Sequence, residues 1–336
     1  MDSKTVFLVT RDIKFTTGYQ RDLLQDFTRA SYKLVPKEFT SILFNYEGKI
    51  SKLELFSKIN QLKNGTEFVN LIDELDLVFD VPKSFVKYFP IQNENYDDSY
   101  DFLSIRISDV NNFDCIINIF SKFKLHFHTR NIEIQILDST DLISAERFIN
   151  YILVEQIKIL LYGKTNVVKL LKSKFKKQTL VAIIDHNESF PKFSNNQIAY
   201  FESRKYNLYF NKRLEVDENG YLFPYIFENK HNICDFPDIN SLISFLSEKL
   251  HWNISKLKVN ICSVFEYKHL CIDNRMLIQM VQNIYYHETE CDYNPYIAKW
   301  KGENDFRDLN SVGIFSNYDG VQINNKKLSA YLNVVS

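Results

Sequence analysis

The feature that most constrains the fold is an alternation of short apolar segments and helical patterns between residues 100 and 200. Strands that alternate with helices form βα units, in which consecutive strands run parallel. The four units found here are too few to close an eight-stranded barrel. We therefore predict an α/β fold in which residues 100–200 form a partial (β/α) barrel. The strands are predicted at 102–107, 132–137, 157–162 and 180–184, and the helices at 113–123, 145–153 and 166–175.

Residues 1–90 carry a different pattern, in which strands come first and helices follow. Ser51 and Glu54 have the spacing of a capping box, which marks the beginning of a helix. Three short strands followed by three short helices predict a winged-helix module. The strands are expected at 6–8, 23–27 and 32–35, and the helices at 37–44, from 51 onward and at 66–75.

Residues 201–336 are predicted to form a third, irregular domain. Asn219-Gly220 lies between two apolar stretches and predicts a β-hairpin, because both positions of its turn need positive φ. A helix is expected at 242–250, directly before a stretch that contains most of the cysteines.

Composition narrows the function. The chain has 41 basic and 42 acidic residues, so no overall field attracts it to nucleic acid or to a membrane surface. No segment approaches the roughly 18 apolar residues of a membrane-spanning helix, and the N-terminus lacks a secretory signal pattern. Five widely spaced cysteines argue against a disulfide framework. We expect a cytoplasmic protein with no nucleic-acid and no membrane partner.

The stretch from Trp252 to Arg275 reads W-N-I-S-K-L-K-V-N-I-C-S-V-F-E-Y-K-H-L-C-I-D-N-R, and C-D-Y-N-P-Y-I-A-K-W follows from Cys291 to Trp300. These residues resemble the C-x2-C-E-F-R-x-x-C-x-D-C-R stretch and the closing C-x-Y-x-P-Y motif of SPASM domains, as the maturation proteins of grasp-with-SPASM peptide systems carry them. The N-terminal stretches V-F-L-V, Y-Q-R-D-L-L-Q-D-F and E-G-K-I are similar to the same family. The resemblance therefore extends over nearly the whole chain.

The match is degenerate at the positions where the family places iron ligands. Cys262 and Cys271 match the first and third cysteines, and Cys291 begins the closing motif. Phe265 and Asn274 replace the second and fourth cysteines. The resemblance further places Glu215 and Tyr225 where a hairpin would supply two more ligands. It also suggests Glu266 and Arg275, which match flanking polar positions of the motif together with Asp273, as an ion pair.

These substitutions bear on the cofactor. A [4Fe–4S] cluster normally needs four thiolates. Phe265 cannot bind iron and Asn274 is a poor ligand, so we expect that the clusters of the family have been lost and that packing fills their place. The C-x3-C-x2-C signature of radical S-adenosylmethionine enzymes does not occur either. We expect neither a functional radical enzyme nor catalytic residues that the sequence can name. A zinc site of Cys262, Cys271, Cys291 and His269 is a rival, but its spacing is not a standard one.

The resemblance implies a binding role in the maturation of a ribosomal peptide. Its systems pair such a protein with an ATP-grasp peptide ligase, which closes links within a precursor peptide. The N-terminal module resembles the RiPP recognition element, which binds the leader of the precursor as an added strand beside its third strand and third helix. On that reading, the peptide-binding residues are Tyr32, Leu34, Phe68, Leu71 and Ile72.

Two alternatives remain open. The first is a peptide-modifying enzyme that acts through the partial barrel, with catalytic residues that cannot be identified from the sequence. The second is a structural subunit that makes no contact with the peptide.

Overall fold

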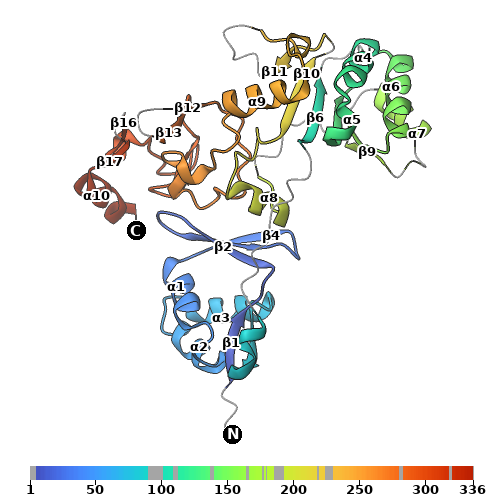
Figure 1. Ribbon diagram of the computed structural model, residues 1–336. Coiled ribbons are helices and arrows are strands. Elements are labelled where there is room, and N and C mark those ends of the chain that lie inside the picture. The colour runs from blue at the N-terminus through green and yellow to red at the C-terminus, as the bar shows by residue number, and fades with distance from the viewer. Residues whose placement is uncertain are drawn as a thin grey trace. The chain divides into compact units, whose positions relative to one another are not determined.

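A computed structural model describes most of the chain (Figure 1). The described residues are 5–89, 101–108, 113–136, 140–163, 166–175, 178, 180–184, 193–217, 219–223, 230–279, 283–317 and 320–335. The chain divides into two compact units. Unit 1 contains residues 1–96, 192–208 and 254–336, and unit 2 contains residues 97–191 and 209–253.

The N-terminal part of unit 1 contains two antiparallel sheets and a group of helices. β1 pairs with β5, and β2, β3 and β4 pair in that order. The strands are β1 (Thr5–Val9), β2 (Ile13–Thr17), β3 (Asp22–Asp26), β4 (Ser31–Val35) and β5 (Val78–Pro82), and the helices are α1 (Lys37–Tyr46), α2 (Lys52–Ile59) and α3 (Gly65–Glu74), with the 3-10 turn η1 (Lys83–Tyr88) after β5. The expected order of strands and helices is present, with β2 and β5 in addition.

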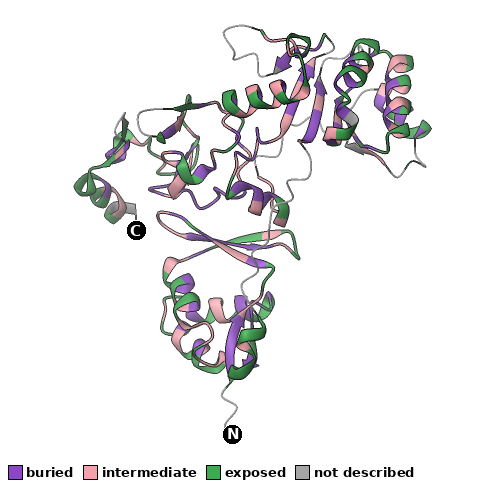
Figure 2. Ribbon diagram, viewed as in Figure 1, coloured by how far each residue is buried: buried purple, intermediate pink, exposed green. Residues whose placement is uncertain are grey.

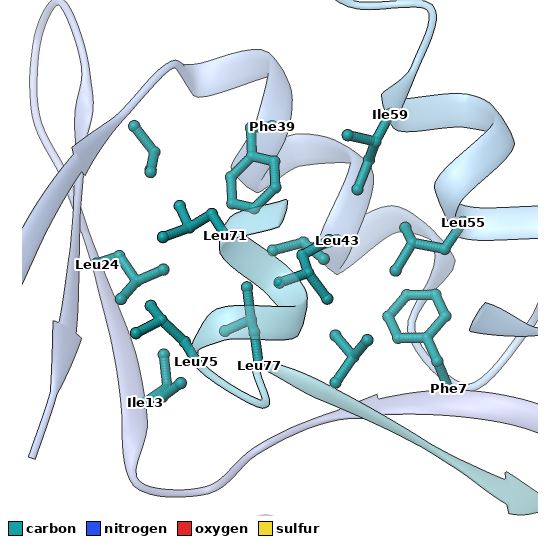
Figure 3. Packing of buried hydrophobic residues seen from close by; sticks show 13 residues of the cluster. Phe7, Ile13, Leu24, Phe39, Leu43, Leu55, Ile59, Leu71, Leu75 and Leu77 are labelled. Carbon is teal, nitrogen blue, oxygen red and sulfur yellow. The ribbon is translucent and has the colours of Figure 1, made fainter. Parts of the chain in front are cut away.

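One apolar core joins these elements. The capping box of Ser51 and Glu54 begins α2 as predicted, with both reciprocal hydrogen bonds. The helices turn their buried sides inward, and β1 is buried over most of its length (Figure 2). Figure 3 shows how the apolar side chains converge from strands and helices. The core includes Phe7, Ile13, Leu24, Phe39, Leu43, Leu55, Ile59, Leu71, Leu75 and Leu77.

Unit 2 is built on a mixed α/β arrangement with a parallel sheet. Among the described residues its strands lie in the order β11-β10-β6-β7-β8-β9, and all neighbours pair in parallel except β10 and β11. The strands are β6 (Phe102–Ser108), β7 (Thr129–Gln135), β8 (Lys158–Tyr162), β9 (Val181–Ile184), β10 (Arg213–Asp217) and β11 (Leu222–Phe223). The helices are α4 (Asp114–Phe123), α5 (Leu125–His128), α6 (Leu142–Val154), α7 (Asn166–Lys174) and α9 (Ile239–Lys249), and η2 (Ile233–Asp235) precedes α9.

The predicted βα strands and helices are confirmed to within a few residues, and the hairpin at Asn219-Gly220 forms between β10 and β11. That hairpin belongs to unit 2, because β10 pairs with β6 in parallel. The two units therefore divide the chain differently from the ranges 1–90, 100–200 and 201–336 expected from the sequence. Among the described residues, no helix combines the length and apolar character needed to span a membrane.

The rest of unit 1 consists of short pieces joined by turns, as the sequence predicts. β12 pairs with β13, β14 with β15, and β16 with β17, each antiparallel. The elements are α8 (Gln197–Ser203), η3 (Lys256–Lys258), η4 (Cys262–Val264), β12 (Leu277–Gln279), β13 (Tyr285–His287), β14 (Tyr293–Asn294), β15 (Lys299–Trp300), η6 (Asn310–Val312), β16 (Ile314–Asn317), β17 (Gly320–Ile323) and α10 (Asn325–Val335).

The turn between β2 and β3 anchors the N-terminal part to this C-terminal part. Tyr19 N donates to the Val264 carbonyl at 2.8 Å, and Gln20 Nε2 donates to the Tyr296 carbonyl at 2.7 Å. Lys268 Nζ returns a hydrogen bond of 2.6 Å to the Thr17 carbonyl. The two parts therefore share one unit rather than standing as separate domains.

Candidate functional site

β4 lies at the edge of its sheet. Its residues pair with β3 over the full strand, from Ser31 opposite Asp26 to Val35 opposite Asp22. Among the described residues no strand pairs with the other side of β4. An edge of this kind presents backbone N–H and C=O groups to which another extended segment can bind.

The two faces of this sheet meet different surroundings. Residues directly opposite one another in neighbouring strands share a face. Leu24 is buried in the helical core, and its neighbour Lys33 lies on that face. Leu23 is buried in a second cluster, and its neighbour Leu34 lies on that other face together with Tyr32. Side chains along β4 therefore alternate between the helical core and the C-terminal part of unit 1.

The five residues predicted to bind peptide do not line one surface. Leu71 and Ile72 are buried in the helical core, and Phe68 is half-buried with its ring centroid 5.1 Å from that of Phe39. Tyr32 and Leu34 are 43% and 36% exposed and lie on the opposite face of the sheet. The edge of β4 is present as expected, but the side chains of α3 mostly support the core.

A segment far along the chain closes one end of the open edge. Asn195 Nδ2 donates to the Ser31 carbonyl at 2.7 Å. The nearby Phe193 ring packs on Tyr267, with centroids 5.2 Å apart, and Tyr267 meets the Tyr32 ring edge-on at 5.8 Å. Sequence analysis missed these neighbours, since Asn195 is 164 residues away from Ser31 and no local pattern links the two.

Phe265 lies at the centre of the aromatic cluster beneath this face. It is buried, with its ring centroid 4.8 Å from that of Tyr293 and 5.3 Å from that of Tyr267. The Trp300 ring packs in a tilted arrangement on Tyr293, with centroids 4.7 Å apart, at the margin of the cluster. At the position where the motif has a cysteine, this chain therefore has a side chain that packs with its neighbours. The aromatic cluster comprises Leu23, Phe193, Phe265, Tyr267, Leu270, Tyr293 and Trp300, and Cys271, Cys291 and Ala298 pack against it.

Glu266 is held by a partner that the sequence did not indicate. The predicted pair with Arg275 is wrong: Arg21 Nε donates to Glu266 Oε1 at 3.0 Å, and the Tyr293 hydroxyl donates to the same oxygen. Burial, together with the neighbouring Glu266 carboxylate, raises the pKa of Tyr293 well above its usual range. Among the described residues, Glu266 Oε2 has no hydrogen-bond partner. Arg21 is thus the cation that is ion-paired with this carboxylate, and the charge of Lys268 also interacts with it.

Gly18 allows this close approach. A Cβ at position 18 would lie 2.4 Å from the Arg21 carbonyl oxygen and 2.7 Å from Glu266 Cβ. Both distances are below van der Waals contact, so only glycine fits between the β2–β3 turn and Glu266 without a shift of the backbone.

Arg275 belongs instead to a buried charged group around Asp273. Arg275 Nε donates to Asp273 Oδ1 at 2.9 Å, and Lys256 Nζ donates to Oδ2 at 3.1 Å. His287 Nε2 lies 3.1 Å from the same oxygen. Burial opposes ionisation of Asp273, but Lys256 and Arg275 hold its pKa well below the usual range.

The cysteines of the motif lie near this group. Cys262 is buried, and burial raises the pKa of its thiol to about 12 against the opposing charge of Lys256. Burial also raises the pKa of Cys271, whereas Cys291 is only half-buried. The raised pKa values favour the neutral form of the Cys262 and Cys271 thiols at neutral pH, and a neutral thiol is a poor nucleophile.

The remaining predicted positions fall in different parts of the chain. Asn274 is exposed, Glu215 lies on β10 in unit 2, and Tyr225 falls outside the described residues. Within the part of the chain that the structure describes, no three His, Cys, Asp or Glu side chains are arranged to hold a metal ion. His269, the fourth ligand of the rival zinc site, is buried with its Nδ1 2.9 Å from Ser203 Oγ.

Unit 2 carries a charged row that sequence analysis did not single out. Arg106 on β6 lies between Glu133 on β7 and Glu215 on β10. Its guanidinium is 2.7 Å from Glu133 Oε2 and 3.5 Å from Glu215 Oε2. Burial raises the pKa of Tyr209, whose phenol interacts with the same groups. In the sequence these charged residues alternate with apolar ones such as Ile105, which is buried, and this alternation could have identified the row.

Comparisons with known proteins give distant matches. No protein-family model and no curated protein sequence matches the chain. Among solved structures, the heterocyclase TruD aligns over 47% of this chain with 11% identity and a TM-score of 0.18. The alignment covers only 25% of the TruD chain. SuiB of Streptococcus suis bound to S-adenosylmethionine aligns over 71% of this chain and 88% of its own, with 7% identity and a TM-score of 0.26. Similarity of this degree does not establish a shared activity.

Proposed function

We propose that this protein binds an extended peptide segment by strand addition to β4 and presents it to a partner enzyme for modification. The observation that carries the proposal is the open edge of β4, where Tyr32 and Leu34 stay exposed beside Tyr267. Added strands gain affinity from backbone hydrogen bonds and selectivity from side-chain contacts on either face. An edge that exposes two apolar side chains in register is suited to both.

The nature of the peptide and of the partner is proposed from the sequence resemblance. The motif from Cys262 to Trp300 is similar to that of grasp-with-SPASM proteins, so the peptide would be the leader of a precursor and the partner an ATP-grasp ligase. At this motif Phe265 packs among aromatic rings where the family has a cysteine, and Cys262 is a buried neutral thiol. Both side chains thus act in packing, which is compatible with a binding role.

A direct test compares two exposed leucines. Peptides selected on the wild-type chain from a random dodecapeptide library would be titrated against Leu34→Ser and Leu170→Ser. Leu170 lies on α7 in unit 2 and is 55% exposed, so it controls for the loss of surface apolar area. We expect Leu34→Ser to weaken binding about fivefold or more, and Leu170→Ser to leave it unchanged. Equal affinities in the two variants would contradict the proposal.

An enzyme acting through unit 2 is the second candidate. The row of Arg106, Glu133 and Glu215 favours it, since it places charged side chains that could orient a polar substrate side by side on the sheet. Incubating the purified protein with a selected peptide and recording its mass separates the two functions. A mass change that Arg106→Met abolishes would support the enzyme, and an unchanged mass would favour binding alone.

A further inference from the structure

A strand bound at β4 would continue the pleat of the sheet. Its side chains would alternate between the two faces, and each would lie opposite one residue of β4. The residues of the partner strand opposite Tyr32 and Leu34 would share the face of the aromatic cluster, and the residue between them, opposite Lys33, would share the face of the helical core.

The outer two positions select apolar side chains. Tyr32 offers a ring edge already packed on Tyr267, and Leu34 lies two residues further along the same face. Aromatic and branched aliphatic side chains opposite such residues stabilise a strand pair, and they remove exposed apolar surface from water. Asn195 occupies the Ser31 carbonyl, so strand pairing would run from Tyr32 toward Val35.

The middle position selects a negative charge. Lys33 Nζ has Glu74 Oε1 of α3 at 3.7 Å, and both side chains are about half exposed or more. A surface pair with this separation is weak. A carboxylate directly opposite Lys33 would add a cross-strand ion pair, whereas a lysine there would place like charges together.

The same lysine disfavours a second copy of this chain as the occupant. An antiparallel pairing that fully overlaps the residues of two β4 strands places Tyr32 opposite Leu34 and Lys33 opposite Lys33. Like charges directly opposite each other destabilise a strand pair, and lysines at sheet edges are a known device against self-association. A peptide with an acidic residue at that position has no such penalty.

We propose that the segment bound at β4 carries the pattern apolar–acidic–apolar, with the acidic residue opposite Lys33 and the apolar residues opposite Tyr32 and Leu34. The pattern reads the same in both directions, so it holds for a parallel or an antiparallel strand. This inference rests on the proposed function and adds the sequence class of the segment that is recognised.

The test uses fluorescein-labelled dodecapeptides that share a Ser/Thr-rich flank and differ at three central residues. The centres are Ile-Glu-Val, Ile-Lys-Val and Ala-Glu-Ala, and fluorescence anisotropy gives each Kd on the full chain. We expect Ile-Glu-Val to bind at least about threefold more tightly than Ile-Lys-Val, and about tenfold more tightly than Ala-Glu-Ala. In Lys33→Glu the order of the Glu and Lys peptides should reverse. In Glu74→Gln, which leaves Lys33 without its weak partner, the Glu peptide should bind more tightly.

Backbone N-methylation of the peptide separates this inference from the function on which it rests. Methyl groups on alternate amides remove the donors of one strand edge only, so one methylated Ile-Glu-Val peptide should lose binding and the peptide methylated at the other positions should keep it. If only one methylated peptide loses binding but the Glu and Lys peptides bind equally, strand addition stands and the apolar–acidic–apolar pattern is overturned. If none of the peptides binds, or both methylated forms bind alike, both the pattern and strand addition fail. Concentration-dependent dimers broken by Leu34→Ser, which removes the cross-strand contact with Tyr32, would assign the edge to a second copy and overturn the pattern as well.

Discussion

Removal of the Arg21 side chain should destabilise unit 1 by more than an ordinary surface charge would. Glu266 is 1% exposed and Arg21 33% exposed, and they form the ion pair that joins the β2–β3 turn to the C-terminal part. Breaking a buried pair by deleting one partner typically costs about 3–5 kcal/mol, because the remaining charge stays buried. Since Arg21 is partly solvated, we expect the lower end, about 3 kcal/mol, for Arg21→Ala.

Urea denaturation followed by Trp300 fluorescence measures this cost. The chain has 2 tryptophans, so a Trp252→Phe background leaves Trp300, which packs on Tyr293, as the reporter. Arg147→Ala is the matched control. Arg147 pairs with Asp114 at 3.2 Å with both side chains more than half exposed, and it should cost about 0–1 kcal/mol.

A double-mutant cycle identifies the cause. Glu266→Gln removes the buried charge and should cost less than Arg21→Ala, because a partly exposed guanidinium can be hydrated. Arg21→Ala combined with Glu266→Gln should be less destabilised than the sum of the single changes by at least about 1 kcal/mol. If Arg21→Ala costs no more than Arg147→Ala, or the two changes are additive, Glu266 is compensated by some other group and the reasoning is refuted.

Three further outcomes are expected. Burial lowers the pKa of His269 to about 3, so below about pH 6.5 the unfolded chain binds a proton that the folded chain does not, and the free energy of unfolding falls. Between pH 7 and pH 5 this loss of stability should be about 2 kcal/mol smaller in His269→Asn, as urea denaturation at both pH values would show. Burial raises the pKa of the Cys262 thiol to about 12, so it should react with iodoacetamide at pH 8 far more slowly than the exposed Cys115 and Cys234. Peptide mapping of timed samples would measure the three rates, and equal rates would contradict the burial of Cys262. Gly18→Ala should cost about 1–3 kcal/mol through overlap with the Arg21 carbonyl and Glu266, and an unchanged urea midpoint would disprove this crowding.

Local patterns were sufficient where the structure depends on local periodicity. The βα strands and helices of unit 2 and the capping box at Ser51 follow from residue spacing within a few turns. β2 was missed because I-K-F-T-T places Lys14 and two threonines within five residues, so its apolar alternation is weak. The strand forms because it pairs with β3 along its whole length.

The site was less predictable because its contacts join distant segments. Glu266 and Arg21 are 245 residues apart, so the sequence offered the nearby Arg275 instead. The edge strand itself could be found from its position before Pro36 and α1. The face on which Tyr32 and Leu34 lie could not, because it depends on the register between β3 and β4 and on which cluster receives Leu23.

The ion pair and the proposed peptide edge are connected through β3. Consecutive residues of this strand are buried in different clusters, Leu24 in the helical core and Leu23 among the aromatic rings. Arg21 immediately precedes β3 and holds Glu266, the neighbour of Tyr267. Loss of Arg21 should therefore loosen the contact of Tyr267 with Tyr32, so that Arg21→Ala releases the Ile-Glu-Val peptide faster. The preference of the protein for Glu over Lys in the peptide should stay unchanged, because it depends on Lys33 on the other face. Stopped-flow dissociation of both peptides tests this, and a loss of the charge preference with no change in release rate would show that the two faces of β4 are not read separately.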